Sequence, residues 1–170
     1  RRQRQMCIRD SPETAMFRDR RLIQFLQRPA EYTHAVFSTA LDPNVFVLRL
    51  VPGMRADIIP MLEGRYRALV LESFGVGGLP GGDDGAMFAA VRDWCGAGHL
   101  AVFTTQVPHE GSDLAVYEVG RAAKALPGVL EAHDMTPEAT AVKLMWVLGQ
   151  TTDRAEAEKL FLTPVQWDIL

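Results

Sequence analysis

Short apolar runs alternate along most of the chain with stretches in which apolar positions recur at helical spacing. Residues 45–51 and 68–71 are almost continuously apolar, and residues 99–104 form a third such run. Runs of this length, bounded by turn residues, predict strands that are buried on both faces, as in a parallel sheet. Residues 128–134 are a weaker fourth candidate.

Apolar residues three and four positions apart predict helices between and after these runs. We expect five helices. Three are predicted over residues 56–62, 114–125 and 154–162. Another runs from a cap at Asp83 or Asp84 to Gly96 or Gly98, and one more begins at Thr136-Pro137-Glu138. The Thr-Pro-Glu start combines a capping hydroxyl, a first-turn proline and an acid. Alternating strands and helices predict an α/β fold: a small parallel sheet of about four strands with flanking helices.

Residues 1–41 do not share this regularity. Seven arginines fall within the first 21 residues, and a short amphipathic helix is predicted over residues 22–26 before Pro29. The arginine-rich start is consistent with a basic arm for an acidic partner, with a disordered tail, or with a prefix foreign to the protein. We therefore divide the chain into a basic arm or linker, 1–41, which includes candidate non-native sequence, and a domain, 42–170.

Composition narrows the function classes. The chain has 170 residues, 48% of them hydrophobic and 23% charged, which is ordinary for a soluble single domain with a core of its own. The net charge of −3 gives no general attraction to nucleic acid. Cys7 and Cys95 have no metal-ligand spacing and predict reduced thiols in a cytoplasmic setting, and the four histidines show no metal pattern. No apolar run approaches the ~18 residues of a membrane-spanning helix.

A glycine-rich loop follows the second apolar run, with Gly75, Gly77 and Gly78 at its start. Strand, loop and helix in this order describe the carboxyl edge of a parallel sheet, where α/β proteins bind ligands. The loop lacks a dinucleotide fingerprint, because Pro80 stands where the third glycine belongs. It also lacks the Gly-Lys-Ser or Gly-Lys-Thr of a phosphate loop. Alone, it predicts either a ligand loop or a structural turn.

A polar loop follows the third apolar run and brings hydroxyl, amide, imidazole and carboxylate groups together: Thr104, Thr105, Gln106, His109 and Glu110. Such groups can bind a polar substrate or transfer a proton. They can equally form a solvated loop that caps the next helix. No nucleophile elbow accompanies them, so a Ser-His-Asp hydrolase is not indicated.

Three stretches together form a pattern whose order and spacing are more specific than any one of them. They are Leu71-Glu-Ser-Phe-Gly-Val-Gly-Gly-Leu-Pro80, then Thr104-Thr-Gln-Val-Pro-His-Glu-Gly111 with Tyr117-Glu-Val-Gly120, and Asp134-Met-Thr-Pro-Glu-Ala-Thr-Ala-Val-Lys-Leu-Met145. Together they resemble the C-terminal domain of type I, cytoplasmic, bacterial L-asparaginases over about residues 42–165. The resemblance implies a small Rossmann-like domain behind a larger N-terminal one, hydrolysis of L-asparagine to aspartate and ammonia, and no cofactor.

The resemblance also implies where the catalytic groups lie. In that family a threonine attacks the side-chain amide, and the threonines, aspartate and lysine of the reaction lie in the N-terminal domain. This chain has no Thr-Gly-Gly-Thr or Thr-Asp-Thr stretch. We therefore expect no catalytic residue in it and no activity from it alone. The implied partners are a missing N-terminal catalytic domain, further copies in a homodimer or homotetramer, and L-asparagine, with no nucleic acid and no membrane.

Five residues are implied to line a neighbouring protomer's substrate site. The family's Gly-x-Gly loop faces that site, so Gly77 and Gly78 are expected to contribute backbone, although relatives often have an Asn in place of Gly78. Tyr117 matches a tyrosine near the neighbouring site, and Glu110 and Asp113 are candidate acidic partners for the substrate amine.

Two further positions concern regulation. Some relatives bind a second asparagine allosterically through an Arg where Glu72 stands and a Cys where Val107 stands. Both residues are changed here, so we expect this regulation to be lost.

Two alternatives remain open at this point. The chain could be a stand-alone, non-catalytic module for amino-acid binding or oligomerisation, or the asparaginase-like subunit of a tRNA-dependent amidotransferase. The sequence does not decide between asparagine and glutamine as substrate.

Overall fold

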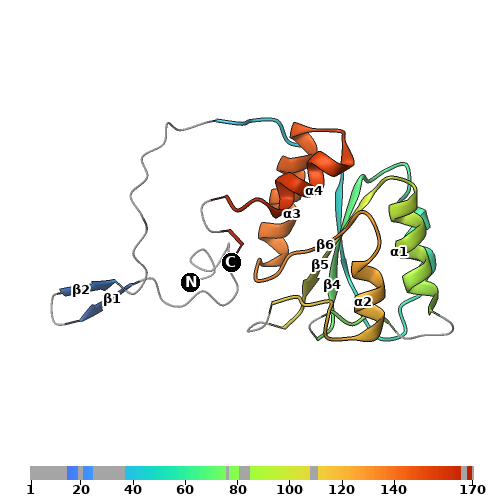
Figure 1. Cartoon of the computed structure of the whole chain (residues 1–170), viewed down its shortest axis with the longest axis horizontal. Helices are drawn as coiled ribbons and strands as arrows, with labels where there is room; N and C mark the ends of the chain where they lie inside the picture. The colour runs from blue at the N-terminus through green and yellow to red at the C-terminus, as the bar shows by residue number, and fades with distance from the viewer. Residues whose placement is uncertain are drawn as a thin grey trace.

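The centre of the molecule is a parallel sheet of four strands (Figure 1). The computed structural model describes residues 15–18, 21–24, 37–75, 77–80, 85–107, 111–165, 168 and 169. The strands are β3 (Val45–Arg49), β4 (Ala68–Ser73), β5 (Leu100–Thr105) and β6 (Val129–Glu131). Their spatial order is β3-β4-β5-β6, and all neighbouring pairs are parallel. The α/β prediction is confirmed.

Helical elements cover both faces of the sheet, as Figure 1 shows. The connections between strands are η2 (Ala56–Ile58), η3 (Pro60–Leu62), α1 (Ala86–Gly96) and α2 (Glu118–Lys124). The other face is covered by α3 (Pro137–Gln150) and α4 (Arg154–Leu162). Because strand order follows sequence order, the sheet has no reversal point of the kind that positions ligands in doubly wound folds.

Alternate residues of the central strands supply two separate hydrophobic cores. Leu69 and Phe103 belong to the core shared with α1, whereas Val70 and Val102 belong to the core shared with α3 and α4. All four side chains are fully buried. Because successive side chains point to opposite faces and both faces are buried, β4 and β5 are almost continuously apolar in sequence.

The first strand is less buried than its sequence predicts. Val47 is 43% exposed and Phe46 is half-buried, with its ring 5.0 Å from that of Tyr66. The expectation of burial on both faces is therefore wrong for β3. The cause is its place at the edge of the sheet, where only β4 is a neighbour.

The helix predicted over residues 56–62 is wrong in kind. The structure has two single-turn 3₁₀ helices, η2 and η3, and the second begins at Pro60. Proline has no N–H to donate, so it interrupts an α-helical hydrogen-bond ladder, whereas short 3₁₀ turns tolerate it.

Two predicted helix starts are also wrong. The cap position of α1 is Gly85, with φ of 71°, and not Asp83 or Asp84. The helix predicted over residues 114–125 begins only at Glu118, because Tyr117, at its cap position, has an extended backbone with φ of −104° and ψ of 148°.

The starts of the last two helices are confirmed. The Thr136 side chain accepts a hydrogen bond from the Ala139 N–H at 3.2 Å, and Asp153 accepts one from Glu156 at 2.8 Å. These caps satisfy backbone donors that the first helical turn leaves without partners. Among the described residues, no helix is long and apolar enough to cross a membrane.

Ahead of the domain, β1 (Ala15–Arg18) and β2 (Arg21–Gln24) pair as antiparallel strands. The helix predicted over residues 22–26 is therefore wrong where it overlaps β2. Short apolar runs fit a strand or a helix equally well until a pairing partner is known. The other predictions for residues 1–14 and 25–36 lie outside the described residues.

Candidate ligand-binding edge of the sheet

Two segments meet at the carboxyl edge of the sheet. The glycine loop, residues 74–80 without Val76, follows β4, and the tyrosine segment, residues 111–117, lies between β5 and α2. The end of β5, with Gln106 and Val107, lies at the same edge. This edge is where the sequence predicted a ligand loop.

The glycine loop closes on itself as a tight turn. Phe74 and Gly78 form an antiparallel bridge, in which the Gly78 N–H donates to the Phe74 carbonyl at 2.9 Å. Gly75 has φ of 59°, which strongly favours glycine. A Cβ on Gly78 would lie 2.9 Å from the Phe74 carbonyl oxygen and 3.1 Å from its ring. In this conformation the loop therefore has no room for an asparagine at position 78.

The glycine loop packs directly against the tyrosine segment. A Cβ on Gly77 would lie 3.0 Å from Leu114 Cδ2 and 3.2 Å from the Asp113 carbonyl oxygen. A Cβ on Gly75 would lie 3.2 Å from the Tyr117 hydroxyl. Tyr117 remains 46% exposed, so its phenol covers the loop while still facing solvent. The structure thus brings together Gly77, Gly78, Asp113 and Tyr117.

A buried carboxylate holds the tyrosine segment in place. Glu131, at the end of β6, is only 6% exposed and accepts a hydrogen bond from the Leu114 N–H at 2.9 Å. Its other oxygen pairs with Lys124 Nζ at 2.7 Å. The hydrogen bond and negative charge of Glu131 raise the pKa of Lys124. A buried carboxylate needs such partners, and this pairing joins β6, the tyrosine segment and α2.

The start of the tyrosine segment docks on backbone beyond β6. The Ser112 N–H donates to the His133 carbonyl at 2.8 Å, and a Cβ on Gly111 would lie 2.9 Å from that same oxygen. His133 itself has φ of 51°, which is uncommon for a residue with a side chain. Close backbone contact therefore fixes the start of the segment.

Gln106 ties three strand ends together. Its amide nitrogen donates to the Leu50 carbonyl at 2.6 Å and to the Glu72 carbonyl at 2.9 Å, and its amide oxygen accepts from Arg49 at 3.2 Å. The neighbouring Thr105 hydroxyl donates to the Gly75 carbonyl and accepts from Val107 at 3.0 Å. These two polar side chains thus order the edge itself, whatever else they bind.

Three other predicted residues are placed with different outcomes. Asp113 is exposed, and its Oδ1 accepts the Ala115 N–H at 2.8 Å, so one carboxylate oxygen stabilises a local turn. Glu72 has a side chain 16% exposed and lies 3.9 Å from the Arg49 guanidinium. Val107 is half-buried, and Glu110 lies outside the described residues.

Sequence reasoning missed Glu131 and Lys124. A glutamate at the end of the otherwise apolar β6 was the available signal, because glutamate is rarely buried without a partner. Within the described part of the chain, no three His, Cys, Asp or Glu side chains gather as metal ligands.

Comparison with known proteins finds a matching family model and relatives in two kinds of protein. Residues 44–161 match the family model of the glutaminase/asparaginase C-terminal domain. An L-asparaginase from Thermococcus kodakarensis is 41% identical over 125 residues, which are 74% of this chain and 37% of that protein. A glutamyl-tRNA(Gln) amidotransferase subunit from Metallosphaera sedula is 32% identical over 161 residues, 92% of this chain and 35% of that protein.

Solved structures agree with the fold. The thermostable L-asparaginase from Thermococcus kodakarensis matches with a TM-score of 0.84 and 33% identity, over 95% of this chain and 48% of that one. L-asparaginase I from Vibrio cholerae matches with a TM-score of 0.78 and the same coverage; at 22% identity it supports the fold alone. The chain spans about a third of the curated relatives' length and about half of the solved chains. It belongs to the glutaminase/asparaginase C-terminal domain family.

Proposed function

We propose that this chain is the C-terminal half of an L-asparagine amidohydrolase, and that it supplies part of an active site whose nucleophile lies outside it. The observation that carries the proposal is the closed glycine loop under the half-exposed phenol of Tyr117, in a domain of this family. The chain contains no Thr-Gly-Gly-Thr or Thr-Asp-Thr stretch, so the attacking threonine must come from another segment or chain.

The proposed reaction assigns this edge a binding role. The threonine hydroxyl attacks the side-chain amide carbon of asparagine, ammonia leaves, and water hydrolyses the resulting ester to aspartate. The backbone at Gly77 and Gly78 forms a wall beside the substrate, and the Tyr117 hydroxyl lies where it can donate a hydrogen bond. Asp113, with one oxygen engaged by Ala115, offers the other to the substrate ammonium.

The edge is proposed to act across an interface between protomers. Three exposed large apolar side chains lie close together in the sequence at the end of the tyrosine segment and the start of α2: Val116, Tyr117 and Val119, at 46% to 53% exposure. An exposed apolar group of this kind next to a ligand edge favours contact with another protomer. We infer a homodimer or homotetramer acting in the cytoplasm. This chain has Glu72 and Val107 where some relatives have the Arg and Cys of an allosteric asparagine site. We therefore propose no allosteric binding of asparagine.

Ammonia release tests the proposal. The full reading frame of the encoding gene and the 170-residue chain are compared with L-asparagine as substrate; the full frame is expected to be active and the chain inactive. In the active protein, Tyr117→Phe keeps the ring but removes the hydroxyl, and should lower kcat/KM about tenfold or more. Met61→Ala, at an exposed position on η3 outside the proposed interface, is the control. Activity in the 170-residue chain alone would refute the proposal.

A second candidate is the asparaginase-like subunit of an amidotransferase. The observation in its favour is that the amidotransferase relative from Metallosphaera sedula aligns with 92% of this chain, against 74% for the L-asparaginase. Ammonia transfer to glutamyl-tRNA by the full reading frame, together with a co-purifying second protein, would select this function. Asparagine hydrolysis without such a partner would exclude it.

The remaining alternative is a binding module, which applies if the gene encodes no catalytic half. Titration of the chain with aspartate and asparagine tests it.

A further inference from the structure

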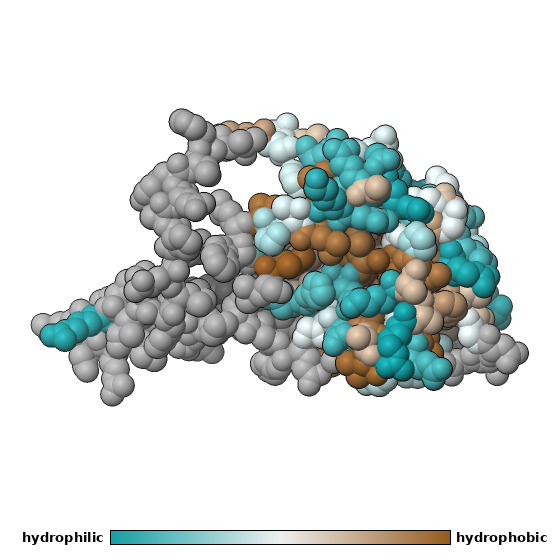
Figure 2. All heavy atoms as spheres, viewed as in Figure 1, coloured by the Kyte–Doolittle hydropathy of each residue, from teal (hydrophilic) through white to brown (hydrophobic). Residues whose placement is uncertain are grey.

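The helix beside the candidate site carries two cations. Arg121 and Lys124 lie in the last turn of α2, the helix that follows the tyrosine segment. Figure 2 shows hydrophilic and hydrophobic residues side by side over the lower part of the domain, where Figure 1 places α2. The acid of the proposed site is Asp113, with one oxygen on the Ala115 N–H and the other assigned to the substrate ammonium. A cation that paired with Asp113 would therefore compete with the substrate.

The first of these cations is held by backbone. Arg121 Nη1 donates to the Ala115 carbonyl at 3.3 Å, within the tyrosine segment. This contact gives the guanidinium an acceptor other than the carboxylate of Asp113.

The second cation is held by the buried carboxylate at the end of β6. Lys124 Nζ lies 2.7 Å from Glu131 Oε1. The other oxygen of Glu131 accepts the Leu114 N–H at 2.9 Å, and that N–H belongs to the peptide bond that follows Asp113. One carboxylate group thus lies between the Lys124 ammonium and the backbone of Asp113. It keeps the cation near the site and pairs with it there.

The Lys124 ammonium interacts with both carboxylates. The hydrogen bond and the charge of Glu131 raise its pKa most, and the charge of Asp113 adds a smaller increase. Glu131 is buried, so water screens its charge less than that of the exposed Asp113. The Lys124 side chain is 53% exposed and has a flexible four-carbon stem. Without the charge of Glu131, the ammonium can therefore turn to Asp113.

We propose that Glu131 is a positioning residue for the candidate site, which keeps Lys124 off Asp113 so that the substrate ammonium can bind there. The inference rests on the proposed function. Glu131 also fixes the Leu114 backbone, and Leu114 Cδ2 lies 3.0 Å from the place of a Cβ on Gly77. The same carboxylate thus orders the segment and satisfies the cation that competes with the substrate.

Asparagine hydrolysis by the full reading frame tests this role. Glu131→Gln keeps the length of the side chain and an acceptor for the Leu114 N–H, but it removes the charge that holds Lys124. KM for L-asparagine should rise about threefold to fivefold, as expected for competition by an exposed ion pair, and kcat should stay within about twofold. The double variant Glu131→Gln/Lys124→Met should recover the wild-type KM, because the competing cation is gone. A purely structural role of Glu131 would not be rescued by removing Lys124.

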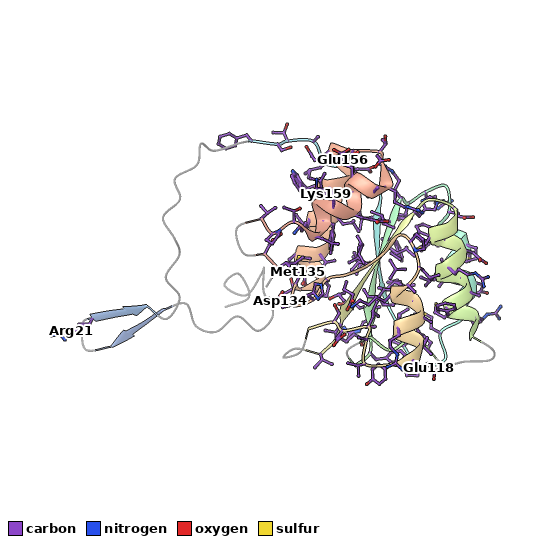
Figure 3. The ribbon with its side chains drawn as sticks, in the orientation of Figure 1. Arg21, Glu118, Asp134, Met135, Glu156 and Lys159 are labelled. Atoms are coloured by element: carbon purple, nitrogen blue, oxygen red, sulfur yellow. The ribbon has the colours of Figure 1, made fainter. Side chains whose placement is uncertain are left out.

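The matched control is Lys159→Met in the Glu131→Gln background. Lys159 is an exposed lysine of α4, which Figure 3 shows at the opposite end of the domain from Glu118, the first residue of α2. This control should keep the raised KM. A KM unchanged by Glu131→Gln, or raised and then not recovered with Lys124→Met, overturns the proposal. Where Glu131→Gln does not fold, Glu131→Asp withdraws the carboxylate by one methylene, and Lys124→Met must reverse its effect on KM.

Carbon-13 NMR of the 170-residue chain separates this inference from the proposed function. The side-chain carboxylate resonance of Asp113 reports whether Lys124 pairs with it. Lys124→Met should shift this resonance several times more in the Glu131→Gln background than in the wild type, as a double-mutant cycle for the pair. That result with no asparagine hydrolysis by the full reading frame would refute the function and leave the role of Glu131 toward Lys124 standing. Equal shifts in the two backgrounds, with an active enzyme, would do the reverse.

Discussion

Gly120 is the position where helix propensity and packing predict opposite effects of the same change. It lies inside α2, and replacing an interior helical glycine by alanine stabilises a helix by about 1 kcal/mol. A Cβ on Gly120, however, would lie 3.1 Å from the Leu114 carbonyl carbon and 3.2 Å from Leu114 Cα, with the carbonyl oxygen closer still. Carbon atoms in good contact are about 3.5–4.0 Å apart.

The neighbours of Gly120 have little freedom to move. Leu114 is fully buried, and its N–H is held by the Glu131 carboxylate. Forcing an extra carbon into a packed site costs about 1–3 kcal/mol, and a backbone neighbour places this case near the upper end. Subtracting the propensity gain leaves Gly120→Ala destabilised by about 2 kcal/mol. That loss corresponds to a fall in Tm of about 4–8 °C for a domain of this size.

Thermal and urea unfolding of the 170-residue chain measure this effect. The matched control is Gly96→Ala at the end of α1, where an added Cβ has no atom within 4 Å. The control should be neutral or slightly stabilised. A Gly120→Ala variant as stable as the control would show that propensity dominates, and would refute the close docking of the tyrosine segment on α2.

Two pH effects follow from ion pairs in the domain. Glu131 raises the pKa of Lys124 in the folded state. This ion pair therefore stabilises the fold fully at pH values below the lysine pKa of the unfolded chain, about 10.4. Its contribution falls as the pH rises through the higher pKa of the folded state. Unfolding of wild type and Lys124→Met should therefore differ by up to about 1 kcal/mol at pH 8, screened by salt, and converge near pH 12. Burial opposes ionisation of Asp42, but the Asn44 N–H and the Arg67 guanidinium outweigh it and lower its pKa. Its contribution is present above about pH 4 and lost as pH falls through the lower folded value, a dependence that Asp42→Asn should flatten in acid unfolding curves.

The parts of the fold that the sequence predicted well depend on neighbours along the chain. The caps at Thr136 and Asp153 bond to residues three positions ahead, so both helix starts can be read locally. The apolar runs of β4 and β5 are visible because both strands are central and buried. The parallel direction of the strands then follows from the helical connections between them.

The remaining errors come from partners that are distant in sequence. The Leu114 N–H finds its acceptor 17 residues away on Glu131, a contact that the apolar pattern of residues 114–125 does not indicate. β1 and β2 form through mutual pairing, and β3 is exposed because it lacks a second neighbour. At the site, no local rule indicates that Gln106 would join three strand ends.

Substitutions at the glycines of the candidate site cannot distinguish a role in substrate binding from a role in folding. Gly75 needs its positive φ, and Gly77 and Gly78 lie too close to their neighbours to carry a side chain without movement. A substitution at any of them would distort the loop, so lost activity would not reveal whether the backbone touches substrate. Tyr117 does separate the two, because Tyr117→Phe removes the hydroxyl beside Gly75 and keeps the half-exposed ring. Tyr117→Phe should preserve the unfolding midpoint and lower kcat/KM; a fall in both would assign the tyrosine to folding alone.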